Sequence, residues 1–153
     1  MGAWGHKALE SDEGLDVVDL LRDNIPANLE FTLTDVIALM KEKGFFGKDF
    51  SEIDFFYDNS AMALAELYIM FREEGKLRYE HEEENKDLAR IKAFTADNNS
   101  LKFLLKYLID IKNEVPDEDD EREIVELWKD SDCWEDWQQH LENCINTIEG
   151  YIK

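Results

Sequence analysis

Hydrophobic residues recur at helical spacing along most of the chain, and one stretch is apolar on nearly every side. Within Ser60–Gly75, the eleven residues Ala61–Phe71 carry a single charge, on Glu66. A helix that is apolar around most of its circumference must be buried. At about 1.5 Å per residue this run covers roughly 16 Å, well short of the ~30 Å core of a bilayer. The pattern therefore predicts the buried central helix of a bundle, at about residues 60–74.

Polar residues at both ends of this stretch are typical of helix termini. Asp58–Ser60 offers side-chain oxygens that can cap its start, and Gly75 can adopt the left-handed conformation that ends it. Apolar stripes at i, i+3, i+4 and i+7 predict further helices on both sides. Their candidate N-caps are Ser11 or Asp12, Thr32 or Thr34, residues 97–100, and a capping box of Asp132 with Glu135. The predicted helices run through Leu15–Leu21, Leu33–Met40, Arg78–Lys92, Leu101–Asn113, Ile124–Trp128 and Trp134–Ile152.

Strand patterns are nearly absent from the chain. The only alternation with the period of a strand lies at Leu29–Leu33, and it is too short to seed a sheet. Met1–Gly5 contains two glycines, which disfavours a helix, so residues 1–8 are expected to form an irregular arm pinned by Trp4. The sequence therefore predicts one all-α domain over residues 1–153, a single-domain helical bundle of about six or seven helices around the central one.

Acidic residues dominate the charged positions of this chain. There are 37 Asp and Glu against 17 Lys and Arg, which gives a formal net charge of −20. The resulting negative potential repels nucleic acid and anionic membranes and attracts cationic partners. Half of this charge lies in residues 114–136, where twelve acidic residues stand against Arg122 and Lys129 for a net charge of −10. Charge that served solubility alone need not cluster in this way.

The clustered charge predicts a surface that binds a basic protein partner, with tryptophans as anchors at its rim. An inhibitor or immunity-type protein that neutralises a cationic toxin has these properties, and so does a mimic of nucleic acid. We expect such a protein to be non-enzymatic, with no membrane or nucleic-acid partner. The predicted partner-binding residues are Asp117, Glu118, Asp119, Asp120, Glu121, Glu123, Trp128, Asp132, Trp134 and Asp136.

Metal-ligand patterns in the sequence fall short of complete sites. The zinc-protease motif His-Glu-x-x-His is broken in His81–Asn85, which does not end in histidine. His140 and Cys144 lie i, i+4 on one helix face, but zinc requires at least a third ligand. Asp117–Glu121 imitates a calcium loop, yet Arg122 stands where the turn glycine belongs. We therefore expect no metal and no cofactor.

An enzyme is the alternative class, although we assign no catalytic residue. Glu66 is the lone charge of the central run, and a buried carboxylate with a raised pKa can act in catalysis. However, Asn59, Glu66 and Glu73 are spaced seven residues apart, and we expect this helical stripe to be the exposed edge. A helical carboxylate- or metal-dependent hydrolase could use Glu66, Glu80 and Glu83. A structural oligomer is a further alternative, and the oligomeric state is left open.

The cysteines and the first residues bear on the cellular compartment. Cys133 and Cys144 are the only cysteines, and they fall in one predicted helix. Eleven positions at about 1.5 Å each place their Cα atoms roughly 16 Å apart, beyond the reach of a disulfide, so both thiols are expected to be reduced. The N-terminus lacks the regions of a secretory signal, and His6 stands where a myristoylation signal has Ser or Thr. A cytoplasmic protein is predicted.

The two ends of the chain resemble an uncharacterised bacterial domain-of-unknown-function family. Its members begin Met-Gly-x-Trp-Gly and continue Phe-Glu-Asn-Asp-x-Ala-x-Asp-Trp, which is similar to Met1–Gly5 followed by Leu9–Asp12 and Asp16. Glu126–Trp128 with Trp137 resembles the family's C-terminal Glu-Leu-Trp and Trp pattern. The resemblance implies a small bacterial protein, with no known catalytic residues to transfer to this chain.

Overall fold

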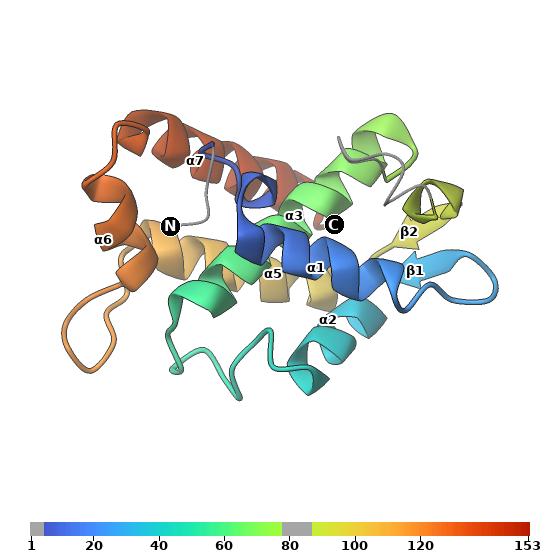
Figure 1. The fold of residues 1–153 in the computed structure, drawn as a ribbon, viewed down its shortest axis with the longest axis horizontal. Helices are drawn as coiled ribbons and strands as arrows, with labels where there is room; N and C mark the ends of the chain where they lie inside the picture. Colours follow the sequence, from blue (N-terminus) through green and yellow to red (C-terminus); the bar gives the residue numbers. More distant parts are fainter. Residues whose placement is uncertain (1–4, 78–86) are drawn as a thin grey trace.

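One long helix, α3 (Phe55–Glu74), runs through the middle of the computed structural model, which describes residues 5–77 and 87–153 (Figure 1). Every residue in Asp58–Tyr68 is buried, and Ala61–Ala65 are 0% exposed. The other helices shield α3 from water because its apolar residues point in all directions. The predicted central helix is therefore confirmed.

The start of α3 differs from the prediction. The helix begins at Phe55, and Asp54 caps it by accepting a hydrogen bond of 2.8 Å from the N–H of Phe56. Asp58–Ser60, which we expected to cap the helix, is buried inside it. The polar side chains of this segment imitate a helix start, but in the interior Asp58 binds Arg122 and Asn59 binds Ser11. The other end is as predicted, because Gly75 takes the left-handed conformation with φ of 75°.

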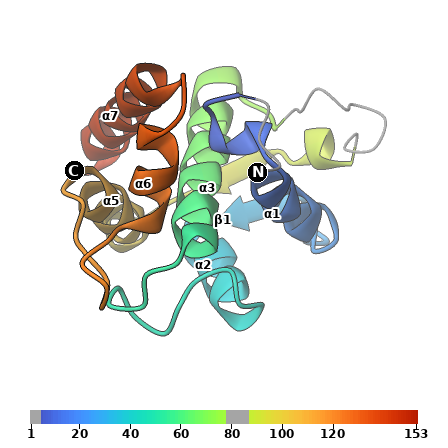
Figure 2. The same cartoon turned by 60° about the vertical axis from the view of Figure 1, so that its left-hand side comes forward.

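Helices on two sides of α3 enclose it, as Figure 2 shows most clearly. On one side lie the 3-10 helix η1 (Ala8–Glu10) and α1 (Asp12–Arg22); α2 (Leu33–Glu42) lies near their far end. On the other side lie α5 (Asn98–Lys112), α6 (Glu123–Lys129) and α7 (Trp134–Tyr151). The described residues thus contain six α-helices, and the predicted all-α bundle is confirmed.

Two short strands form a parallel pair at the edge of the bundle (Figure 1). Strand β1 (Glu30–Thr32) pairs with β2 (Ala93–Thr95), and Phe31 lies opposite Phe94. Our expectation that Leu29–Leu33 could not seed a sheet is therefore wrong. The strand is stable because a partner from a distant part of the chain pairs with it, and because the two phenylalanine rings lie 5.7 Å apart and are buried.

Most of the predicted charged helix at Arg78–Lys92 lies outside the described residues, which include only its part from Asp87 onwards. The part that is described is not α-helical. A 3-10 helix, η2 (Leu88–Arg90), is followed by an extended connection to β2. Leu88 and Ile91 in this part are buried.

Three predicted N-caps are confirmed, and one is wrong in addition to that of α3. The capping box of Asp132 and Glu135 does not form, because Cys133 occupies the N-cap of α7 without a side-chain cap. Its N–H instead donates a hydrogen bond of 3.2 Å to the hydroxyl of Ser131. The confirmed caps are Ser11 on α1, Thr32 on α2 and Asp97 on α5, with hydrogen bonds of 3.1, 3.1 and 2.8 Å respectively.

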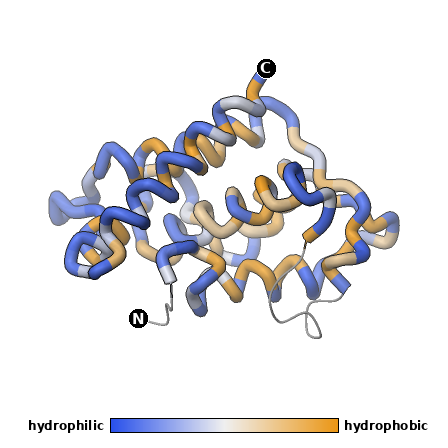
Figure 3. The backbone as a smooth tube through the Cα atoms, turned by 90° about the horizontal axis from the view of Figure 1, so that it is seen from above, coloured by the Kyte–Doolittle hydropathy of each residue, from blue (hydrophilic) through white to orange (hydrophobic). Residues whose placement is uncertain are grey.

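The distribution of hydrophobic residues matches this arrangement. In Figure 3, α7 alternates between hydrophilic and hydrophobic residues along its length, as an amphipathic helix should. Its inward residues Trp137, Leu141, Ile145 and Ile148 are buried. No helix in the described part of the chain combines the length and the apolar character needed to cross a membrane.

Candidate partner-binding site

The acidic segment 114–136 connects three helices at one end of the molecule. It runs from the end of α5 through a loop into α6 and on to the first turn of α7 (Figure 1). Asp117 and Trp134 are half-buried. Seven of the predicted partner-binding residues are exposed, namely Glu118, Asp119, Asp120, Glu121, Glu123, Asp132 and Asp136.

Trp128 differs from the expectation that it anchors a partner at the rim. Its side chain faces the core and is 6% exposed. The ring stacks on Trp137 with the centroids 5.9 Å apart, and Trp134 stacks on the other indole at 5.7 Å. Trp128 therefore supports the surface from beneath, while Trp134 reaches the rim.

The loop before α6 is closed on itself by hydrogen bonds. The N–H of Asp117 donates to the carbonyl of Glu121 at 2.8 Å. The Asp117 carboxylate in turn accepts from the N–H groups of Asp119 and Glu121, at 2.8 and 3.1 Å. Asp120 adopts a left-handed conformation with φ of 60°, which Asp tolerates better than most residues. These bonds hold the exposed carboxylates of the loop in one backbone conformation.

A buried ion pair fastens this loop to the central helix. The guanidinium of Arg122 donates to both carboxylate oxygens of Asp58 on α3, at 2.8 and 2.6 Å, and the two side chains are 2% and 1% exposed. Arg122 also donates to the carbonyl of Val115, at 3.2 Å. Both ends of the loop are therefore tied to the core through one side chain. Burial raises the pKa of Asp58 to about 6, against the opposing effect of Arg122, so the carboxylate is ionised at neutral pH.

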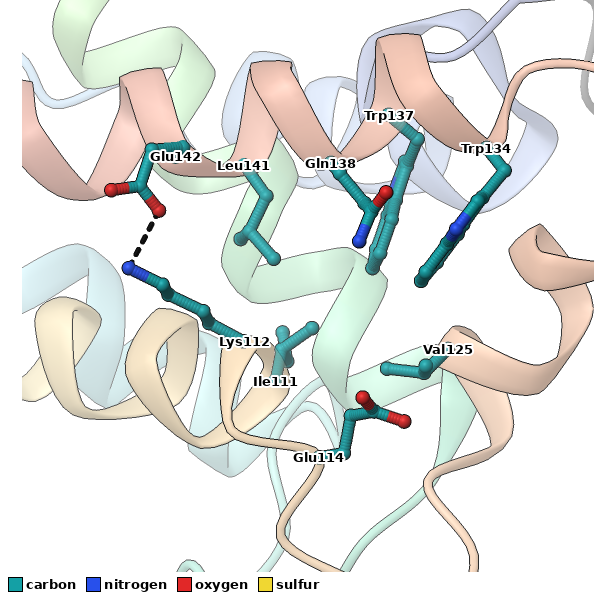
Figure 4. A pocket seen from close by; sticks show the side chains of 9 residues that line it. All are labelled: Ile111, Lys112, Glu114, Val125, Trp134, Trp137, Gln138, Leu141 and Glu142. Atoms are coloured by element: carbon teal, nitrogen blue, oxygen red, sulfur yellow. Dashed lines mark ion pairs between the residues drawn. The ribbon is translucent and has the colours of Figure 1, made fainter.

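A pocket of about 110 Å³ lies between α5, α6 and α7, next to the acidic segment. Figure 4 shows the indoles of Trp134 and Trp137 extending side by side from α7 towards α5 and α6. Aliphatic side chains form a further part of the walls, and Lys112, Glu114, Gln138 and Glu142 complete the lining. The apolar wall residues are Ile111, Val125, Trp134, Trp137 and Leu141.

The charged groups of the pocket lining are already paired with each other or with a neighbour. Lys112 forms an ion pair of 2.7 Å with Glu142, drawn as a dashed line in Figure 4. Lys129 approaches Glu114 to 2.6 Å, and its ammonium lies 6.0 Å from the ring centroid of Trp134. The hydrogen bond to Glu114 raises the pKa of Lys129. These lysines neutralise two carboxylates of the lining and leave the acids of the loop uncompensated.

A second cluster of titratable groups surrounds Glu66 in the interior. The expectation that Glu66 lies on an exposed edge is wrong: Glu66 is 8% exposed and Asn59 is 3% exposed, while Glu73 is exposed. The Glu66 carboxylate accepts from the N–H groups of Ala8 and Leu9 at 2.7 and 2.9 Å. These contacts explain how a charged residue is stable in the buried part of α3.

His140 of α7 completes this cluster. Its Nε2 lies 2.8 Å from a Glu66 oxygen and 3.7 Å from the Cys144 sulfur. Burial lowers the pKa of His140, but the hydrogen bonds to Cys144 and Glu66 and the Glu66 charge outweigh burial and raise the pKa to about 10. The imidazole is therefore protonated at neutral pH, and it forms an ion pair with Glu66.

This cluster has the geometry of a structural clamp. A nucleophilic relay needs the histidine to contact the thiol through one ring nitrogen and the carboxylate through the other. Here both partners approach Nε2, and Cys144 is 4% exposed. Across residues 5–77 and 87–153, no three His, Cys, Asp or Glu side chains are placed to hold a metal ion. His81, Glu80 and Glu83 lie outside the described residues.

Two parts of this site were not predicted. The sequence gives one indication of the buried pair of Arg122 and Asp58. Arg122 is the one base within the acidic residues 117–126. The pocket has no comparable signal, since its walls come from three helices.

Comparison with known proteins identifies the family but no better-characterised relative. Neither the curated proteins nor the solved structures provide a significant match. One family model matches residues 2–140, a region that includes α3 and the whole acidic segment. The match covers most of the chain and supports the resemblance to a domain-of-unknown-function family. The chain belongs to the family described as Domain of unknown function (DUF4259).

Proposed function

We propose that the chain is a non-enzymatic interaction protein of the inhibitor or immunity type, which binds a basic protein through the acidic segment 114–136. The observation that carries the proposal is the joint exposure of the seven predicted partner-binding carboxylates Glu118, Asp119, Asp120, Glu121, Glu123, Asp132 and Asp136 in this segment. Its two bases do not offset them at the surface, because Arg122 is buried on Asp58 and Lys129 is paired with Glu114.

The structure of the loop favours binding over a role in solubility alone. Hydrogen bonds to Asp117 and the buried Arg122 fix the loop backbone, so a partner loses little affinity to loop ordering. Concentrated charge of one sign also steers an oppositely charged protein and raises its association rate. This effect weakens with salt, because the Debye length is about 8 Å at physiological ionic strength.

The alternative of a carboxylate-dependent hydrolase receives less support. Glu66 would have to act as a base, but its oxygens already accept two backbone N–H groups and pair with His140. A general base needs a free oxygen within reach of the proton that it removes. The contacts of Glu66 favour a structural role for this carboxylate.

Affinity capture from the source lysate tests the proposal. The immobilised chain is expected to retain a basic protein at low salt and release it at high salt. The decisive variant neutralises five exposed acids of the segment without shortening their side chains. It combines Glu118→Gln, Asp119→Asn, Asp120→Asn, Glu121→Gln and Glu123→Gln.

A matched control changes the net charge by the same amount elsewhere. Its five exposed acids lie on α1, α2 and α3. We expect the control to retain the captured protein, and the segment variant to lose it. Retention of no basic protein at low salt, or equal loss by the two variants, would contradict the proposal. The control combines Asp12→Asn, Asp16→Asn, Asp35→Asn, Glu42→Gln and Glu73→Gln.

A further inference from the structure

We infer that the pocket between α5, α6 and α7 receives an aliphatic side chain of about leucine size, carried by the basic partner and flanked there by lysine or arginine. This inference rests on the proposed function, and it names the chemistry that the same site recognises. It is carried by the volume of the pocket, its apolar walls, the internal pairing of its charges and the position of the surrounding acids.

The size of the pocket selects among hydrophobic side chains. A cavity of about 150 Å³ lined by apolar side chains is large enough to bind benzene. The pocket here measures about 110 Å³, which is smaller. It accommodates a branched aliphatic side chain such as leucine or isoleucine.

The pairing of the charged groups excludes a charged occupant. Lys112 is paired with Glu142 at 2.7 Å, and Glu114 with Lys129 at 2.6 Å. A lysine or arginine that entered the pocket would have to displace one of these internal cations. An aliphatic group displaces none of them, and it buries its surface against the indoles and against Ile111, Val125 and Leu141.

Acids beside the pocket specify what flanks the aliphatic residue. The acidic loop starts at Glu114 and ends before Val125, and both of these residues line the pocket. A partner segment whose leucine enters the pocket therefore places its neighbouring residues beside carboxylates, which favours lysine or arginine at those positions.

Two synthetic peptides test this inference against the full chain. Both carry the same charge: one is acetyl-Lys-Arg-Leu-Lys-Arg-amide, and the other has alanine in place of leucine. Calorimetric titration at low salt should show at least about tenfold tighter binding of the leucine peptide, because burial contributes about 0.8 kcal/mol per CH₂ group. The indole N–H signals of Trp134 and Trp137 should shift in NMR spectra with the leucine peptide only.

Substitutions at two neighbouring positions separate the effect of the pocket from that of the surface beside it. Gln138 lines the pocket, so Gln138→Phe places a ring in it, whereas the exposed Gln139 does not line it. We expect Gln138→Phe to abolish the preference for leucine and Gln139→Phe to retain it, with unchanged melting temperatures. Equal affinity of the two peptides for the wild-type chain would overturn the pocket inference alone. Failure of both peptides to bind at low salt would overturn the proposed function as well.

Discussion

Two buried carboxylates, Asp58 and Glu66, each hold a cation from a distant part of the chain. Asp58 holds Arg122 from the acidic loop, and Glu66 holds His140 from α7. Replacement of a whole buried ion pair by apolar residues often costs no stability. Removal of only one partner is costly, because it leaves a buried charge unpaired. Both acids lie on α3, so the buried central helix also carries the charges that position other elements.

Replacement of Asp58 with alanine tests the first pair. The Arg122 guanidinium would then keep only its hydrogen bond to Val115 in a site where it is 2% exposed. We expect Asp58→Ala to lower the free energy of unfolding by about 3–5 kcal/mol, measured by urea denaturation. The double variant Asp58→Leu with Arg122→Met should recover a large part of this loss. A loss below about 1 kcal/mol in the single variant would show that the pair is solvated.

The second pair predicts a dependence of stability on pH. The pKa of His140 is raised in the folded chain to about 10, from 6.5, by Cys144 and Glu66 against the effect of burial. The proton bound by the folded state therefore stabilises the fold fully below about pH 6.5, and this stabilisation disappears as the pH rises to about 10. Between pH 7 and pH 10, the free energy of unfolding of the wild type should fall relative to that of His140→Gln by up to about 1.4 kcal/mol per pH unit. If the free energies of unfolding of wild type and His140→Gln differ by a constant amount from pH 7 to pH 10, the ion pair is contradicted.

At the scale of elements, the amphipathic stripes were sufficient to predict α1, α2, α5 and α7, whereas the starts of α3 and α7 were not predicted. These stripes are local features, and three of the predicted caps are the observed ones. The start of α3 was misplaced because Asp58–Ser60 has the composition of a cap, while the side chains of Asp58 and Asn59 bind partners far away in sequence. The Asn59 amide, for example, donates to the Ser11 hydroxyl at 2.9 Å.

The sequence does not predict the strand pair or the Glu66 clamp, because the partners in each case are distant along the chain. Strand β1 is stable only through β2, which follows it by about sixty residues in the sequence. Glu66 looked like a surface residue because its spacing from Glu73 is helical, and Glu73 is indeed exposed. Its actual partners come from η1 and α7, and no local pattern identifies them.

Replacement of Glu66 with glutamine tests the clamp between η1, α3 and α7. Glutamine has a similar size but lacks the charge and offers only one acceptor oxygen. We expect Glu66→Gln to accelerate hydrogen exchange at the amides of Ala8 and Leu9 by more than about tenfold, since each tenfold corresponds to 1.4 kcal/mol. Glu73→Gln, an exposed change on the same helix, should leave both rates unchanged. Protection that persists in Glu66→Gln would contradict the clamp.

At the scale of the whole molecule, the sequence predicted where charge concentrates but not what lies beside it. Residues 114–136 were identified from their net charge of −10, and seven of the predicted contact residues are exposed. Burial of Trp128 and formation of the pocket depend on how α6 packs against α3 and α7. These relations are tertiary, so composition and periodicity do not contain them. The acidic segment and the pocket together define the face that we propose for the partner.

The affinity of the purified basic partner for three forms of the chain tests the central claim most directly. Calorimetry at low salt compares the wild-type chain, the variant with five neutralised acids in 114–136, and the control with five neutralised acids on α1, α2 and α3. Because the two variants have equal net charge, only the position of the lost charge differs. We expect the segment variant to bind at least about tenfold more weakly than wild type, and the control to bind within about threefold of it. Equal weakening in the two variants would show that only total charge matters and would contradict a binding site in the acidic segment.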